Sequence, residues 1–131
     1  MKIRNLIVIA LALVPVGAFA QGNAVPTIVK GKADTVGNNC RNNKWFEVEA
    51  KISGDTVEGT LLGSAFQRGP TSFSGKASEG KFAATITYAN ANNLKVEIIG
   101  TKSSEDSWEL STIWNGGGIS NCESKGPAKV G

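Results

Sequence analysis

Histidine is absent from this chain of 131 residues, which also has only two cysteines, one methionine and four prolines. The absence of histidine excludes a conventional Ser-His-Asp triad, an imidazole general base and a histidine-ligated zinc ion. Apolar runs of membrane-spanning length are absent too, because the run at residues 6–14 is too short to cross a bilayer and no second one follows. We therefore expect no histidine-based catalysis and no membrane insertion of the mature chain.

The N-terminal segment has the features of a targeting signal. Lys2 and Arg4 form a positive n-region, residues 6–14 form an apolar h-region, and Ala18-Phe19-Ala20 matches an A-x-A cleavage site. We expect residues 1–20 to be a cleaved Sec-type signal peptide and residues 21–131 to form a single all-β domain. The protein is then exported, to the periplasm or to the outside of a bacterial cell.

The charge balance changes once this segment is removed. The whole chain has 14 basic and 11 acidic residues, a net charge of +3, and loss of the two basic residues of the signal leaves 12 against 11, or +1. Basic and acidic residues are interspersed along the chain and form no basic block. We therefore expect no nucleic-acid partner.

Cys40 and Cys122 are the two cysteines, and an even pair in an exported protein is most simply a disulfide. A bridge between them would close a loop of roughly 80 residues, which the chain-entropy model values at about 4 to 5 kcal/mol at most. The alternative, a nucleophilic cysteine, needs a base such as histidine, which the chain lacks. The pair therefore predicts a structural disulfide.

Apolar and polar residues alternate with period two through much of the chain, as in half-buried strands. In residues 46–52, for example, apolar residues take the even positions and charged residues the odd ones. Runs of this kind, with weaker ones at residues 27–33 and 119–125, give about eight strands. Short turns rich in Gly, Ser, Asn, Asp and Glu separate several of them, at residues 53–55, 79–80, 90–93 and 105–106.

The pattern predicts an all-β fold, a small antiparallel up-and-down β-barrel of about eight strands with one disulfide. An even number of strands lets the last pair with the first, which removes exposed edges. A two-sheet β-sandwich is the alternative. Four aromatic residues take the inward phase and are expected in the core: Phe46, Phe82, Trp108 and Trp114.

Glycines recur inside the expected strands in the form apolar-x-Gly-[Thr/Lys], at residues 29–32, 57–60, 73–76 and 98–101. A glycine weakens a strand unless the chain must bend sharply or approach another backbone. These glycines therefore indicate the tight corners of a strongly curved sheet. The alternative is that they leave room for a ligand inside the barrel.

Carboxylates are the remaining candidates for catalysis, as a pair in a glycosidase. Glu105 and Asp106 share a turn, and two turn acids fall short of a calcium loop. The other carboxylates mostly take the outward phase of the strands, as a solvated, salt-paired face would: Glu47, Glu49, Asp55, Glu58, Glu97 and Glu109. We expect no catalytic residue, no metal site and no cofactor.

Asparagine and tryptophan residues near the cysteines form the candidate binding patch. Trp45 ends the stretch GNNCRNNKW (residues 37–45), and Trp114 begins the stretch WNGGG (residues 114–118). The disulfide would bring the two stretches together, with aromatic faces and amides that suit a sugar ring or a protein anchor. In the structural alternative, Trp114 fills the barrel end and the asparagines form turns. The patch consists of Asn42, Asn43, Trp45, Trp114 and Asn115.

Three classes of function remain. The favoured one is a binding module that presents loops to a protein or glycan partner, in the manner of an inhibitor or an adhesin. A hydrolase is disfavoured by the residue inventory, and no pattern specifies an oligomeric state. The alternative to the binding module is a carrier of a small apolar ligand inside the barrel, suggested by small inward residues: Gly59, Gly75, Ala77, Ala84 and Gly100.

Overall fold

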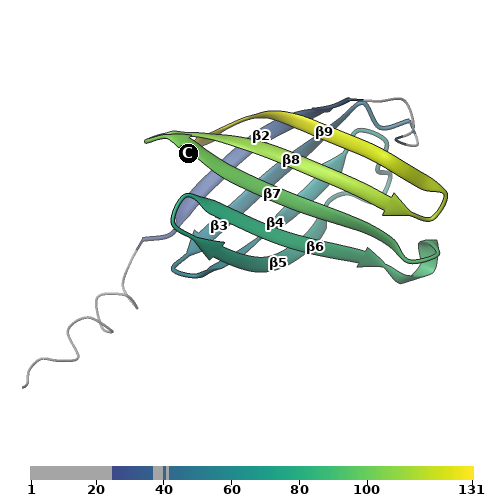
Figure 1. Cartoon of the computed structure of the whole chain (residues 1–131), viewed down its shortest axis with the longest axis horizontal. Coiled ribbons are helices and arrows are strands. Elements are labelled where there is room, and N and C mark those ends of the chain that lie inside the picture. The colour runs from purple at the N-terminus through teal and green to yellow at the C-terminus, as the bar shows by residue number, and fades with distance from the viewer. Residues whose placement is uncertain (1–24, 37–39, 41) are drawn as a thin grey trace, which may run out of the picture.

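Eight antiparallel strands form a closed barrel in the computed structural model (Figure 1). The structure describes residues 25–36, 40 and 42–131, so the expected signal peptide lies outside the described residues. A short 3₁₀ helix, η2 (Ala89–Ala91), follows β6. The strands are β2 (Thr27–Thr35), β3 (Trp45–Ser53), β4 (Thr56–Gly63), β5 (Thr71–Ser78), β6 (Lys81–Tyr88), β7 (Leu94–Ser104), β8 (Ser107–Gly116) and β9 (Ile119–Val130).

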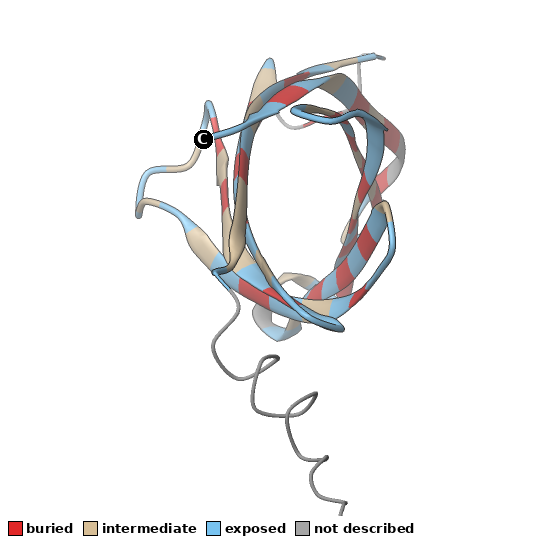
Figure 2. Cartoon of the chain, turned by 90° about the vertical axis from the view of Figure 1, so that its left-hand side faces the viewer, coloured by how far each residue is buried: buried red, intermediate tan, exposed pale blue. Residues whose placement is uncertain are grey.

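Each strand pairs with its neighbours in sequence, and the last strand pairs with the first. The closing pair, β2 with β9, is antiparallel and places Val29 opposite Val130 and Asp34 opposite Lys125. Figure 2, a view from the left-hand side of Figure 1, shows the ring of strands without a break. The prediction of an up-and-down barrel of eight strands is confirmed, and the two-sheet sandwich does not form.

The interior is filled by the residues that the period-two pattern assigned to it. Phe46, Phe82, Trp108 and Trp114 are all at most 6% exposed, and aliphatic side chains of every strand pack around them. Charged residues of the same strands alternate onto the outer face, as in β3, where exposed and inward positions alternate after Trp45. The core of the barrel is therefore a packed core of aromatic and aliphatic side chains.

The strand glycines let neighbouring strands approach closely inside this core. A Cβ atom built on Gly59 would overlap the backbone oxygen of Glu49, and one on Gly75 would overlap that of Ala83. A Cβ on Gly100 would overlap the ring of Phe82. The space beside these glycines is already occupied, which supports their role as corners of a tightly coiled sheet and not as room for a ligand.

The two ends of the barrel differ in how the chain reverses. At one end, called here the turn end, residues 54–55, 79–80 and 105–106 form two-residue turns, and the C-terminus lies beside them (left in Figure 1). At the other, called the loop end, the connections are residues 36–44, 64–70, 89–93 and 117–118. The longer connections therefore gather at one end.

Candidate functional site

The Cys40–Cys122 disulfide fixes the longest connection to the barrel wall. The two Cα atoms are 5.3 Å apart and 82 positions apart in sequence, and both side chains are buried. The predicted disulfide is thus present, and such bonds are typical of oxidising compartments. Next to it, the backbone N–H of Val36 donates to the carbonyl of Glu123 (2.7 Å). Connection 36–44 is therefore anchored to β9 by one covalent bond and one hydrogen bond.

Asn43 joins this connection to its neighbour, residues 64–70. Its side-chain nitrogen donates to the carbonyl of Cys40 (3.0 Å), and its side-chain oxygen accepts from the N–H of Ala65 (2.8 Å). The N–H of Lys44 also donates to the hydroxyl of Ser64 (2.7 Å). The two loops are thus held together by side-chain bonds that span 20 and 22 positions of sequence.

The other two connections of the loop end pack backbone against backbone. A Cβ atom on Gly116 would lie 2.8 Å from the carbonyl oxygen of Asn93, too close for any side chain. Asn92 and Asn93 both have positive φ (56° and 60°), a conformation that asparagine tolerates better than most residues. The turn between β8 and β9 therefore lies directly against residues 89–93.

An aromatic cluster closes the barrel beneath these loops. The Trp114 ring stacks on Phe46 (centroids 4.8 Å apart) and on Tyr88 (6.1 Å), and Phe66 meets it edge-on at 6.2 Å. Phe66 belongs to loop 64–70, and the missing side chain of Gly63 leaves room for its ring. Phe66 and Tyr88 are half-buried, so their rings extend the core to the surface of the loop end.

The polar atoms of this cluster are only partly satisfied. The indole Nε1 of Trp114 donates to the hydroxyl of Thr112 (3.2 Å), which pairs with that of Ser124 (2.5 Å). The Tyr88 hydroxyl is buried beside Thr71 and completes no hydrogen bond with the residues that the structure describes. Burial raises the pKa of Tyr88 above its ordinary value of 10.0, and the Thr71 hydroxyl offsets part of the rise.

The residues of the predicted patch do not share one surface. Trp114 is only 4% exposed and lies inside the barrel, whereas Trp45 is half-buried on the outer face, where the Lys32 ammonium sits 5.1 Å from its ring centroid. The side chain of Asn43 forms hydrogen bonds to Cys40 and to Ala65 of loop 64–70. Asn42 and Asn115 are exposed at the loop end. The inward phase of Trp114, which is visible in the sequence, explains its burial.

Phe66 and Tyr88 are the surface aromatics that sequence reasoning missed. Phe66 lies in a loop with no periodic pattern, and Tyr88 takes the inward phase at the very end of its strand. The sequence did contain one signal for Phe66. In Gly63-Ser64-Ala65-Phe66, a large aromatic residue in a loop follows a glycine that ends a strand.

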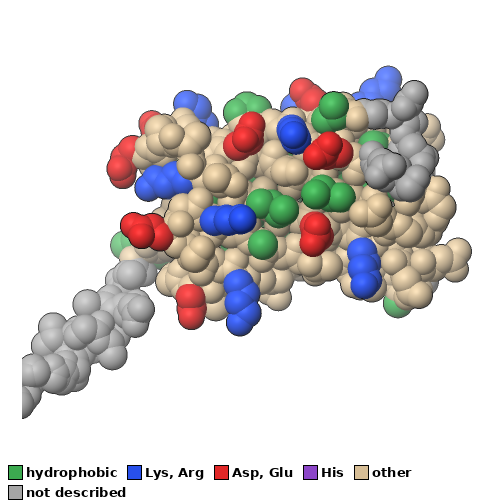
Figure 3. Space-filling model, in the orientation of Figure 1, with side chains coloured by type: hydrophobic (Ala, Val, Ile, Leu, Met, Phe, Trp, Pro, Cys, Tyr) green, Lys and Arg blue, Asp and Glu red, His purple; other side chains and the backbone are tan. Residues whose placement is uncertain are grey.

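The connections at the two ends of the barrel differ in their charged residues. The described residues of the four loop-end connections include Lys44 and Arg68 and no Asp or Glu, and the sequence adds no acid at residues 37–39 and 41. On the face in Figure 3, acidic side chains lie over the centre and the left-hand end, and none is seen at the right-hand end. The two-residue turns of the turn end carry four exposed carboxylates: Asp55, Glu79, Glu105 and Asp106.

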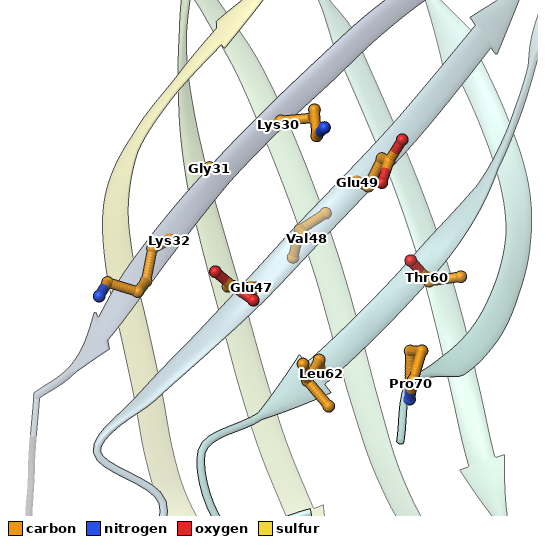
Figure 4. A pocket seen from close by; sticks show the side chains of 9 residues that line it. All are labelled: Lys30, Gly31, Lys32, Glu47, Val48, Glu49, Thr60, Leu62 and Pro70. Carbon is orange, nitrogen blue, oxygen red and sulfur yellow. The ribbon is translucent and has the colours of Figure 1, made fainter.

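A second candidate surface is a hollow of about 580 Å³ on the outside of the barrel (Figure 4). The β2 row Lys30 and Lys32 stands in register with the β3 row Glu49 and Glu47. The two positive and two negative charges balance, so this outer hollow offers no net charge to select a ligand. It is lined by Lys30, Gly31, Lys32, Glu47, Val48, Glu49, Thr60, Leu62 and Pro70.

The described part of the chain lacks two features that would suggest other functions. No group of three or more Cys, Asp or Glu residues there is arranged to hold a metal ion. No helix there has the length and apolar character needed to cross a membrane. Comparison with protein-family models, curated proteins and solved structures finds no match to this chain.

Proposed function

We propose that the protein is an exported, non-catalytic binding module that holds a protein or glycan partner at the loop end of the barrel. The observation that carries this proposal is the fixing of the long connections: the disulfide, Asn43 and the Gly116–Asn93 contact hold the described residues of three loops in place. Loops held in place before binding lose less conformational entropy on binding, which favours recognition. Export rests on the N-terminal targeting segment, and the disulfide is consistent with it.

A ligand carrier has less support than a surface binder. The inward positions that suggested a cavity, such as Gly59 and Gly75, lie against the backbone of the neighbouring strand. The core positions along the barrel axis hold large aromatic side chains. The exterior is therefore the better place to look for a partner.

Affinity capture with a blocked loop end tests the proposal. The immobilised mature chain would be incubated with periplasmic and extracellular extracts, and bound proteins and glycans would be identified. Ala65→Trp places a bulky ring at an exposed loop-end position, and Ser104→Trp does the same at an exposed position next to the turn end. We expect Ala65→Trp to abolish capture and Ser104→Trp to leave it unchanged. Capture that survives Ala65→Trp, or the absence of any specific partner, would overturn the proposal.

A further inference from the structure

We infer that the partner of the loop end is an acidic polysaccharide, one that carries carboxylate groups along a chain of sugar rings. The inference rests on the proposed function and adds the chemical class of the ligand. Three properties of the loop end support it: the sign of its charge, the type of its polar groups and the exposure of its aromatic rings.

The charge at the loop end selects for anions. Lys44 and Arg68 are exposed, and the described residues of the four connections offer no carboxylate that would neutralise them. The acidic turns lie at the opposite end of the barrel, where Glu105 lies 3.8 Å from the Lys102 ammonium, and so do not neutralise Lys44 and Arg68. An arginine can bind a carboxylate with two parallel hydrogen bonds, and a lysine supplies a compact positive charge.

The uncharged polar groups of the loop end suit hydroxyl groups. A side-chain amide both donates and accepts hydrogen bonds, as does each hydroxyl of a sugar. Amides of this kind are spread over three of the four connections and the adjoining end of β8, in contrast to the charged side chains of the barrel wall. Those that are exposed at described positions are Asn42, Gln67, Asn92, Asn93 and Asn115.

The aromatic rings supply an apolar surface for a sugar ring. Phe66 and Tyr88 are half-buried, and each packs against the fully covered Trp114 ring, which holds their orientation. Aromatic residues that keep an apolar face at the surface are typical of binding sites, since they bury much area at little cost in conformational entropy. Cations, amides and aromatic faces therefore occur together at the loop end.

A nucleic acid fits this surface less well. Lys44 and Arg68 are too few to follow a phosphate backbone, in which each neutralised phosphate needs its own cation. The balanced charges of the outer hollow, which extends along β2 and β3 toward the same end, do not prolong the positive surface.

Isothermal titration calorimetry at low salt tests the inference with three probes of similar length: tetragalacturonate, the neutral maltotetraose, and tetraglutamate. We expect the mature protein to bind tetragalacturonate and to bind the other two at least tenfold more weakly. Lys44→Gln/Arg68→Gln should weaken binding of tetragalacturonate about tenfold or more, as expected for the loss of charge-assisted contacts. Phe66→Leu, which keeps an apolar side chain but removes the aromatic face, should weaken it several-fold.

The control is Glu105→Gln/Asp106→Asn, which removes charge at the turn end and should leave tetragalacturonate binding within twofold. Absence of binding, equal binding of maltotetraose, equal binding of tetraglutamate, or an unchanged Lys44→Gln/Arg68→Gln variant would each overturn the inference. Loop-end-dependent capture of a protein or a neutral glycan from extracts would then leave the proposed function standing, so the two failures are distinguishable.

Discussion

At the turn end of the barrel, the chain reverses direction in two residues each time; at the loop end, three of the four connections are longer, and side-chain bonds join two of them to each other. The turn end carries acidic side chains at the turn tips, and its turn carbonyls accept backbone hydrogen bonds from neighbouring strands, as Asp55 does from the N–H of Ala77 (2.9 Å). Its side-chain bonds are local in sequence, such as the Thr56 hydroxyl donating to the Ser53 carbonyl (3.0 Å). The loop end has the disulfide, the two side-chain bonds of Asn43 and an aromatic layer beneath the loops.

This difference shows which connections the barrel requires in order to close and which are longer than closure requires. Tight turns at positions such as Gly54 and Gly80, both with positive φ, are sufficient to connect antiparallel strands. Closing the barrel therefore requires no loop as long as residues 36–44 or 64–70. The additional length at the loop end, and the bonds that fix it, are the features on which the proposed binding function rests.

Loss of the disulfide should have the largest effect on stability. Cys40→Ser/Cys122→Ser removes a link across 82 positions, and chain entropy predicts a loss of up to about 4 to 5 kcal/mol in the free energy of unfolding. Urea denaturation would measure it, with reduced wild-type protein as a second sample that should match the variant. A loss below about 1 kcal/mol would show that the loop end is held by its other contacts.

Asn43→Ala should cost more than a comparable change at the turn end. The substitution leaves the N–H of Ala65 without its partner and removes the donor to Cys40, for an expected loss of about 1 to 3 kcal/mol. Thr56→Ala, which removes one exposed turn-end bond, is the matched control and should cost about 0.5 kcal/mol or less. Equal losses in thermal or urea unfolding would contradict the contrast between the two ends.

Replacing each of the two core tryptophans, Trp108 and Trp114, should give a smaller difference in stability between the two ends. Trp114 donates its indole N–H to Thr112, whereas the indole nitrogen of Trp108, near the turn end, is buried without a partner among the described residues. Both changes to Phe remove similar ring volume, but only Trp114→Phe loses a hydrogen bond. We expect Trp114→Phe to be the more destabilising by about 1 kcal/mol in urea unfolding. The reverse order would mean that Thr112 does not hold the Trp114 ring.

The pH dependence of Tyr88 should have the smallest effect. Because burial raises its pKa above 10.0 in the folded state, the stabilisation from the neutral phenol is complete below pH 10 and is lost as pH rises through the folded-state pKa. Tyr88 is the only tyrosine, so its ionisation can be followed directly by ultraviolet absorbance. The folded protein should titrate above the unfolded one, and Tyr88→Phe should remove the absorbance change and this part of the alkaline destabilisation. Titration of folded protein at or below 10.0 would indicate a solvated hydroxyl.

Most of the fold could be predicted from the sequence, because local patterns determine it. Period-two alternation assigned Phe46 and Trp108 to the core, and turn residues such as Glu79-Gly80 placed the strand ends. The disulfide followed from there being only two cysteines. The last strand was harder: β9 continues past Lys125 through Gly126 and Pro127, two residues that usually end a strand, because Gly126 lies against the β2 backbone.

The candidate site could be predicted only in part, because it depends on contacts between loops. The sequence pointed to the loop end of the barrel through Cys40 and Cys122. It did not show that Asn43 is used to join two loops, or that Phe66 folds back over the barrel, since both depend on partners about twenty positions or more away in sequence. The charge difference between the ends also becomes visible only when the topology brings the connections together.

Mapping the bound ligand onto the backbone amides tests the central claim, that the loop end is the binding surface, most directly. A titration of the isotope-labelled mature protein with tetragalacturonate, followed by two-dimensional NMR, reports every amide at once. We predict shifts confined to residues 42–44, 64–70, 89–93 and 115–118. Shifts centred on the turns at 54–55, 79–80 and 105–106 or on the outer hollow around Lys30 and Glu49 would contradict the claim, whereas no shifts at all would overturn the inference of an acidic polysaccharide.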